Sequence, residues 1–325
     1  MKNASNNPAP PDVEGLEWRL ITRNDPGALV ELAQSGYQVD GGLGFLFVPE
    51  AIQAHFFSGE NGTGLGAFLP DGRLAAGITV HLVGNPGQQR AKITGLVRPG
   101  LRGKGLGTYL LSWSESQARQ LCADEGTAPG LLQVATESLS AAARRLYLAH
   151  GFQSVFEELV MERALSTPLP EAGLPPDVTL VNWQAGLAEQ FFCAYQTAFR
   201  ERPGFPGYSA AEWIGQTTES DFKPEWSFLA RVQAAPSGFV LGYIDLTRDP
   251  PGGYIGQVGV APAQRRRGLA SLLLVESMRR MQAEGVRAAL LAVHVNNPGA
   301  LEAYTRIGFK TVGRRARFER LAEPA

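Results

Sequence analysis

Two short turns, each rich in glycine and basic side chains, are the segments of this chain best suited to chemistry. They are Arg102–Gly107 (RGKGLG) and Arg265–Ala270 (RRRGLA), and each stands directly before a segment with apolar residues at helical spacing. The first N–H groups of a helix have no partner within the helix, and the helix dipole adds partial positive charge there. Small residues also let the backbone approach a ligand closely. Both turns therefore predict anion sites suited to a pyrophosphate.

Other phosphate-binding motifs do not fit these turns. A Walker loop requires GxxxxGK followed by Ser or Thr, which neither turn supplies. A dinucleotide-binding fingerprint requires GxGxxG in the first βαβ unit, whereas Gly103, Gly105 and Gly107 follow the spacing GxGxG in mid-domain. The alternative is a solvated basic helix start without a ligand. Repetition of the turn, each time with the same elements after it, favours a ligand site.

The turns belong to a pattern that the chain carries twice, at a period of about 160 residues. Residues 93–107 resemble residues 256–270 at an offset of 163, and Tyr147–Phe152 resembles Tyr304–Phe309 at an offset of 157. A proline-rich stretch near the midpoint separates the two copies, as an extended linker would. The sequence predicts a disordered lead-in at residues 1–14, an N-terminal domain at 15–165, a linker at 166–176 and a C-terminal domain at 177–325.

The composition is typical of a folded protein of two domains. The chain has 325 residues, of which 44% are hydrophobic and 19% charged. Thirty basic and 31 acidic side chains leave a formal charge of −1, which argues against a nucleic-acid groove. No apolar run approaches the ~18 residues of a bilayer span, and the N-terminus has no apolar signal-peptide region. We therefore expect a cytoplasmic protein without a nucleic-acid or membrane partner.

The cysteines and histidines do not indicate a metal site or a disulfide framework. The two cysteines, Cys122 and Cys193, lie in no CxxC or Cys/His spacing. The four histidines are scattered, without an HxH or HExxH arrangement. No metal is expected.

A joint motif in both copies is the most specific indication of function. The second copy has Arg265-x-x-Gly268-x-Ala270, followed by Asn297-x-x-Ala300-x-x-x-Tyr304-x-x-x-Gly308-Phe309. The first copy has Arg102-x-x-Gly105-x-Gly107, followed by Ser140-x-x-Ala143-x-x-x-Tyr147-x-x-x-Gly151-Phe152. This pattern resembles the GCN5-related N-acetyltransferase (GNAT) superfamily, in its tandem two-domain form, and the motif regions cover about half of each repeat.

The resemblance implies both a fold and a reaction. The fold is α+β, with two tandem GNAT-like domains that each have a mixed, mostly antiparallel central sheet flanked by helices. The reaction is direct transfer of the acetyl group of acetyl-CoA to an amine of a small molecule or peptide. In the second copy the residues expected to bind acetyl-CoA are Val258, Gly259, Val260, Arg265, Arg266, Arg267, Gly268, Leu269, Ala270 and Asn297. In the first copy they are Leu96, Val97, Arg102, Gly103, Lys104, Gly105, Leu106 and Gly107.

Tyr304 is the residue that we expect to act as the acid. It matches the family tyrosine that reaches the sulfur of CoA, and a phenol with a pKa near 10 can donate a proton to a departing thiolate. The alternative is a tyrosine that merely packs its helix on the sheet. Asn297 is expected either to bind CoA or to cap the helix that follows it.

The general base is not identified by the sequence. Many family members carry a glutamate on the fourth strand, but Gly256-Gln257-Val258 contains no carboxylate. His294 and Asp245 are candidates, because both stand on predicted strands near the expected site. Proton removal through ordered water would need neither of them.

We expect the C-terminal half to catalyse, since the first copy has Ser140 where the second has Asn297. The alternative function is a CoA-binding sensor or scaffold without turnover. An interaction module built on the arginines 265–267 is disfavoured by the near-neutral charge. Acceptor specificity is expected in segments 41–61 and 199–223, and the assembly is expected to be a monomer or a homodimer.

Overall fold

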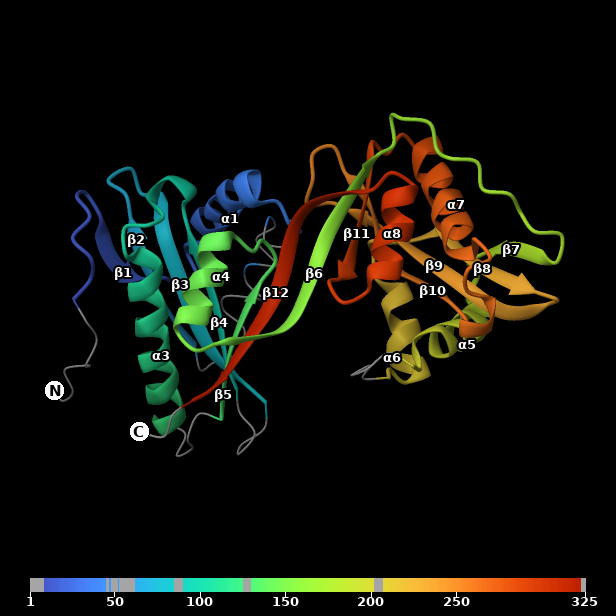
Figure 1. The fold of residues 1–325 in the computed structure, drawn as a ribbon. Helices are drawn as coiled ribbons and strands as arrows, with labels where there is room; N and C mark the ends of the chain where they lie inside the picture. The colour runs from blue at the N-terminus through green and yellow to red at the C-terminus, as the bar shows by residue number, and fades with distance from the viewer. Residues whose placement is uncertain are drawn as a thin grey trace. The chain divides into compact units, whose positions relative to one another are not determined.

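The computed structural model describes residues 9–44, 47, 52, 62–84, 90–124, 130–201 and 207–322. The chain divides into two compact units (Figure 1). Unit 1 comprises Met1–Val160 and Val312–Ala325, and unit 2 comprises Met161–Thr311. Both are α/β units with mostly antiparallel sheets, so the predicted fold class is confirmed.

Unit 1 is built on a sheet whose order is β1-β2-β3-β4-β5-β12-β6. Neighbours β1 to β4 are antiparallel, β4 and β5 are parallel, and β5 and β12 are antiparallel. Its strands are β1 (Glu17–Leu20), β2 (Gly62–Phe68), β3 (Leu74–Val83), β4 (Arg90–Val97), β5 (Leu131–Thr136), β6 (Gln153–Ala164) and β12 (Lys310–Leu321). Its longer helices are α1 (Pro26–Asp40), α3 (Leu106–Asp124) and α4 (Ala141–Ala149).

Helices cover both faces of this sheet because β3 and its neighbours carry apolar side chains on both sides. The predicted stripe of α3 is confirmed, since Leu106, Leu110 and Trp113 are buried in one core cluster together with Tyr147 of α4. A second cluster forms under α1 around Leu29, Leu32 and Leu74.

Unit 2 repeats this plan. Its sheet has the order β6-β11-β10-β9-β8-β7, where β6 enters with its last residues. The strands are β7 (Val178–Asn182), β8 (Phe222–Val232), β9 (Ala235–Asp245), β10 (Gly252–Val260) and β11 (Ala288–His294). The longer helices are α5 (Ala188–Phe199), α6 (Ala210–Gly215), α7 (Leu269–Ala283) and α8 (Pro298–Arg306).

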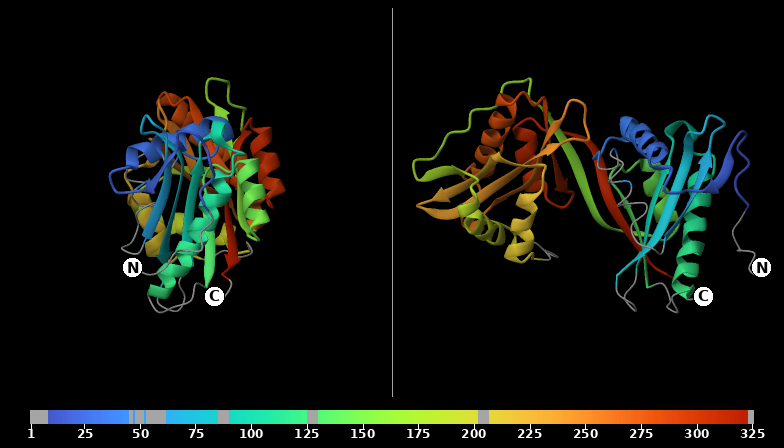
Figure 2. Two further views of the ribbon diagram at one scale, coloured as in Figure 1. Left: turned by 90° about the vertical axis from the view of Figure 1, so that its left-hand side faces the viewer. Right: turned by 180° about the vertical axis from the view of Figure 1, so that it is seen from behind.

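In unit 2, α5 and α6 lie on one face of the sheet, and α7 and α8 lie on the other (Figure 2). The α5/α6 face is aromatic, with Trp213 buried against Phe239. On the α7 face, Gly253 brings β10 close to the helix, because a Cβ there would lie 2.5 Å from the sulfur of Met281. Within the described residues no helix has the length and apolar character that a bilayer span requires.

The last strand departs from the predicted domain boundaries. The sequence predicts that residues 312–325 belong to the C-terminal domain, whereas the structure places them in unit 1. There Ala316–Leu321 of β12 pairs with Thr136–Leu131 of β5, and Phe318 is fully buried in the core beside Tyr147. Conversely, β6 ends in unit 2, so each sequence half contributes its last strand residues to the other unit. The predicted linker 166–176 contains no helix or strand, and residues 1–8 of the predicted lead-in lie outside the described ranges.

We predict that Phe318→Ala destabilises unit 1 although the residue stands near the C-terminus. Removal of a fully buried phenylalanine should lower the free energy of unfolding by about 3–5 kcal/mol. Hydrogen exchange should become faster in residues 131–160, as measured by mass spectrometry. Leu321→Ala on the same strand is the control, because Leu321 is 75% exposed. Faster exchange in residues 178–260 with unchanged exchange in 131–160 would contradict the assignment of β12 to unit 1.

Candidate functional site

The end of β10 has a strand partner on one side only. Its parallel pairing with β11 covers Gly253–Ile255 opposite Ala289–Leu291 and then stops. On the other side its antiparallel pairing with β9 continues to Val260 opposite Gly238. The two central strands of unit 2 therefore part from each other at the level of Gly256–Val260.

The backbone N–H groups of Val258 and Val260 point into this opening. Ala261 donates its N–H to the carbonyl of Ser237 on β9 at 2.8 Å, so the amide of Ala261 faces β9. Because N–H groups alternate sides along a strand, Gly259 also faces β9, and Val258 and Val260 face the other way. Of the three predicted residues on this strand, Gly259 therefore presents its amide to the sheet rather than to a ligand.

A β-bulge lies directly before these amides. Ile255 is opposite Gly242 and Gln257 is opposite Leu241, so Gly256 is an extra residue in β10. Only glycine fits there, because a Cβ would lie 2.6 Å from the ring of Tyr243. The bulge changes the side to which the following amides point. No equivalent register shift separates β4 from β3 in unit 1.

The turn after β10 has the geometry of an anion site. Gly268 is the N-cap of α7 with φ +82°, and Arg266 has φ +62°. The first amides of α7 therefore lack intrahelical partners and follow two left-handed residues. Arg265, Arg266, Arg267 and Gly268 are exposed, Ala270 is half-buried, and Leu269 is buried beneath the turn.

Two of the three arginines are already engaged within the protein. Arg265 donates from Nε to the carbonyl of Val260 at 3.3 Å and from Nη2 to the carbonyl of Ala198 at 3.0 Å. Arg267 donates from Nη2 to both carboxylate oxygens of Asp177 at 2.7 and 2.8 Å. The expectation that both bind phosphate is thus not supported by their contacts. Arg266 has no ion-pair partner in the part of the chain that is described.

The first turn has the same backbone. Gly103 and Gly105 have φ +80° and +81°, at the positions that correspond to Arg266 and Gly268. Gly105, Gly103 and Lys104 are exposed, Leu106 is buried, and Gly107 packs against Leu146 of α4. Arg102 donates to the carbonyl of Val97 at 3.3 Å and forms a bidentate pair with Asp40, with distances of 3.0 and 2.5 Å.

Unit 1 has a corresponding opening beside β4, but only one of the two predicted strand residues faces it. Pairing of β4 with β5 stops at Ile93, so the strands part in unit 1 as well. Arg98 donates its N–H to the carbonyl of Ala75 on β3, so Leu96 also faces β3 and only Val97 of the two predicted residues faces the opening. A small cavity there is lined by Tyr37 and Phe47, whose rings meet edge to face at 4.9 Å.

The two motif tyrosines are both buried. Tyr147 packs against Phe152 and Phe318 in the core of unit 1, and burial raises the pKa of its phenol to about 12. Tyr304 is on α8, is 8% exposed and lies 6.2 Å from Phe309 between ring centroids.

The other predicted residues have local roles. The Oδ1 atom of Asn297 accepts the N–H of Ala300 at 3.2 Å, so the side chain caps α8, as Ser140 caps α4.

His294 ends β11 and its Nδ1 accepts the N–H of Asn296 at 3.1 Å. Asp245 lies opposite Gly252 at the start of β10, and it accepts from the backbone and hydroxyl of Thr247. The structure therefore brings His294 to the level of the opening but leaves Asp245 at the far end of the strand.

The sequence analysis missed an aromatic and acidic group on the α5/α6 face of β10. Tyr243 and Tyr254 are cross-strand neighbours, so they share this face. Burial, and then Glu219 and Asp221, raise the pKa of the Tyr243 phenol. Trp213 donates its Nε1–H to Oε1 of Gln257 at 2.9 Å, which places Gln257 on the same face. The spacing of two tyrosines on consecutive strands was the signal that could have revealed this group.

Segments 41–61 and 199–223, which we expected to determine acceptor specificity, are described only in part. Residues 45–46, 48–51, 53–61 and 202–206 lie outside the described ranges, and Phe205 is among them. Phe222 packs on Tyr243 with 5.5 Å between ring centroids, so part of the second segment does reach the face that carries the tyrosines.

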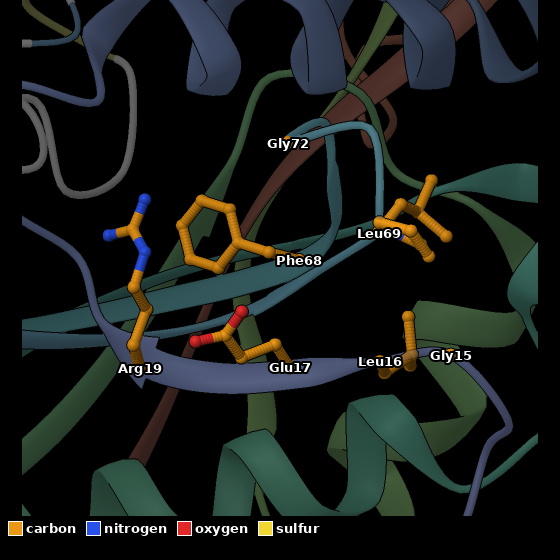
Figure 3. A pocket seen from close by; sticks show the side chains of 8 residues that line it. Gly15, Leu16, Glu17, Arg19, Phe68, Leu69 and Gly72 are labelled. Carbon is orange, nitrogen blue, oxygen red and sulfur yellow. The ribbon is translucent and has the colours of Figure 1, made fainter.

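A larger pocket of about 410 Å³ lies in unit 1, between β1 and the turn that joins β2 and β3 (Figure 3). Arg19 lines this pocket, lies over the ring of Phe68 at 3.6 Å and pairs with Asp25 at 2.7 Å. This pairing lowers the pKa of Asp25 to about 2. No predicted site residue lines the pocket, and among described residues no group of three His, Cys, Asp or Glu side chains has the arrangement of metal ligands.

Comparison with known proteins gives consistent matches over both halves. The family model described as "Acetyltransferase (GNAT) family" matches residues 28–152 and 188–309. A mycothiol acetyltransferase of Nocardia farcinica (strain IFM 10152) is 30% identical over 87% of this chain and 89% of its own. One of Thermobispora bispora is 28% identical over 90% of this chain and 95% of its own.

Two solved structures match at least 95% of the chain. A GCN5-related N-acetyltransferase from Sphaerobacter thermophilus has a TM-score of 0.71 and 25% identity over 96% of this chain and 98% of its own. A tandem GNAT protein from the clavulanic acid biosynthesis pathway has a TM-score of 0.64 and 16% identity, over 95% of this chain and 99% of its own, and supports the fold alone. The chain therefore belongs to the GNAT acetyltransferase family, as an acyltransferase with two copies of the family's domain.

Proposed function

We propose that unit 2 transfers the acetyl group of acetyl-CoA to an amine of a small molecule, and that unit 1 does not catalyse. One observation carries this assignment. The end of β10 combines a bulge at Gly256 with N–H groups that face an opening in the sheet, directly before the anion turn of α7. In unit 1 the strands part as well, but β4 has no bulge opposite β3.

The turn and the strand end offer donors for two parts of acetyl-CoA. The free amides at the start of α7 and the side chain of Arg266 suit the pyrophosphate, because both donate to an anion. The amides of Val258 and Val260 suit the carbonyl oxygen of the thioester, which gains negative charge during the reaction. Backbone donors held by a sheet need no reorganisation when that charge develops.

Tyr304 is the residue that we propose as the proton donor to the thiolate of CoA. It lies on α8, whose first turn is fixed by the Asn297 cap. The corresponding Tyr147 is surrounded by Phe152 and Phe318 in the core of unit 1, where packing explains its presence. A neutral phenol donates when the carbon–sulfur bond breaks and the sulfur becomes basic.

Water is the base that we propose for the amine. A lysine-like amine has a pKa of about 10.4 and must lose a proton to attack. Asp245 stands at the other end of β10, and Nδ1 of His294 already accepts from the backbone, so its other ring nitrogen carries the proton in the neutral form. Water takes one proton from the ammonium form before attack. The neutral amine nitrogen then bonds to the acetyl carbon, the carbon–sulfur bond breaks, and the nitrogen releases its second proton to water. The sulfur receives the proton of Tyr304, which regains a proton from the solvent.

The face that carries Tyr243 and Tyr254 suits the acceptor. Burial, and then the charges of Glu219 and Asp221, raise the pKa of the Tyr243 phenol, so two carboxylates lie near this face. Their negative charge attracts an acceptor that arrives as an ammonium ion. The relatives named mycothiol acetyltransferase favour a small molecule over a peptide.

We predict that Tyr304→Phe lowers kcat by about 100-fold, because the thiolate loses its proton donor. Thiol release from acetyl-CoA with a panel of small primary amines measures the rate. Tyr147→Phe is the matched control and should leave kcat unchanged. Equal losses in the two variants would assign catalysis to both units.

The alternative function is a CoA-binding sensor or scaffold. The presence of Gln257, where a carboxylate could act as the base, favours this alternative. Calorimetry that shows binding of CoA, together with no thiol release for any amine, would support it.

We predict that Arg266→Gly has opposite effects on stability and on substrate binding. The left-handed φ of +62° strains an arginine, so glycine should raise the free energy of unfolding by about 1 kcal/mol. Loss of the guanidinium should raise the KM for acetyl-CoA by about tenfold. Gly103→Arg in the first turn is the reciprocal control, which should lower stability and leave KM unchanged. An unaltered KM in Arg266→Gly would exclude a contact of the Arg266 guanidinium with the phosphates.

A further inference from the structure

Arg163 is a buried arginine in unit 2 for which the reaction just described provides no role. It stands near the end of β6 and is 7% exposed. Its Nη1 donates to the carbonyl of Ile307, and its Nη2 donates to the carbonyl of Pro168 at 2.7 Å. Within the described ranges no carboxylate pairs with it, and its Nε is buried without a partner. Burial accordingly lowers the pKa of its guanidinium.

A buried guanidinium without a carboxylate partner lowers the stability of the fold, so the contacts of Arg163 need an explanation. The stability of the folded state falls because the buried cation loses its hydration. A fully apolar side chain would fill the same place without this cost. The functional gain that offsets the burial of Arg163 should therefore come through the group that this side chain contacts most closely.

That group is the C-terminal end of α8. Ile307 is the C-cap of this helix, and its carbonyl belongs to the last turn, where carbonyls lack intrahelical partners and the helix dipole is negative. Tyr304 lies within the same turn, and its own carbonyl accepts the N–H of Phe309 at 3.0 Å. A cation at this end fixes the turn that carries the tyrosine.

The glycine of the motif is explained by the same contact. Gly308 has φ +95°, and a Cβ there would overlap the guanidinium of Arg163. The Gly308-Phe309 pair therefore leaves space for an arginine that comes from outside the motif.

The same arrangement occurs in unit 1, at an offset of 157 residues. Arg320 of β12 donates to the carbonyl of His150, the C-cap of α4, and Gly151 has φ +78°. There the charge is compensated, because Arg320 also pairs with Glu115 at 2.8 Å. Each arginine thus stands on the last strand of one sequence half and caps the tyrosine-bearing helix that belongs to the other sequence half.

We propose that Arg163 is a positioning residue for Tyr304: by holding the last turn of α8 it sets the place of the phenol relative to β10. This inference rests on the proposed function of unit 2. It implies that residues 177–325 lack a part of their own catalytic apparatus, which β6 supplies from the N-terminal half of the sequence.

The test uses the full-length chain with Arg163→Met, Arg163→Lys and Arg320→Met. We expect Arg163→Met to lower kcat by about tenfold with an unchanged KM for acetyl-CoA, since a misplaced acid slows the chemical step. Arg163→Lys, which keeps a cation at the helix end, should recover most of that loss. Arg320→Met is the matched control, and it should leave kcat unchanged although it removes the equivalent cap from α4. Hydrogen exchange should become faster in residues 298–309 of Arg163→Met and stay unchanged in α7.

A double-mutant cycle separates positioning from general destabilisation. In the Tyr304→Phe background, Arg163→Met should change kcat by less than about twofold, because the group that it positions is already absent. Additive losses, or faster exchange throughout unit 2, would overturn the inference. If the unaltered protein releases thiol and Arg163→Met does so at the same rate, the inference alone fails. If the unaltered protein releases no thiol with any amine, the proposed function fails and the inference fails with it.

Discussion

The backbone donors at the end of β10 form the constraint on which the candidate site depends. A strand inside a sheet normally satisfies its N–H groups on both sides, and an unpaired buried donor is costly. Here β10 keeps β9 as a partner to Val260 but loses β11 after Ile255. Arg265 joins the end of β10 to the end of α5, because it donates to the carbonyls of Val260 and Ala198. This basic motif residue therefore contacts the backbone of its own unit.

The exchange of strand ends makes each unit depend on the other sequence half. β12 brings Phe318 into the core of unit 1, and β6 brings Arg163 to the last turn of α8 in unit 2. Neither predicted domain, taken as a contiguous stretch of sequence, would contain all the residues that its core and its helix cap require. The linker at 166–176 can therefore not be treated as a simple boundary between two independent folding units.

The sequence predicted the elements well, because periodic apolar stripes, glycine turns and the duplicated motif are local signals. It could not predict the strand exchange. Arg163 and Arg320 occupy the same place in two similar strands, 157 residues apart, and a pattern shared by both strands does not say which helix either one meets. Nor does a motif give side-chain direction. Arg265 is where the motif puts it, yet its guanidinium contacts backbone carbonyls. Asn297 caps the following helix, which is one of the two roles expected for it.

The two units share a fold but differ in the features that lower the stability of the folded state. Unit 1 has glycine where the turn is left-handed and a carboxylate beside its capping arginine. Unit 2 has an arginine with φ +62°, a buried guanidinium without a carboxylate partner in the described residues, and a bulge in its central strand. Features that lower stability persist where function requires them, and elsewhere mutation replaces them with residues that give a more stable fold. The strained Arg266, the bulge at Gly256 and the buried Arg163 therefore agree with the proposal that unit 2 catalyses.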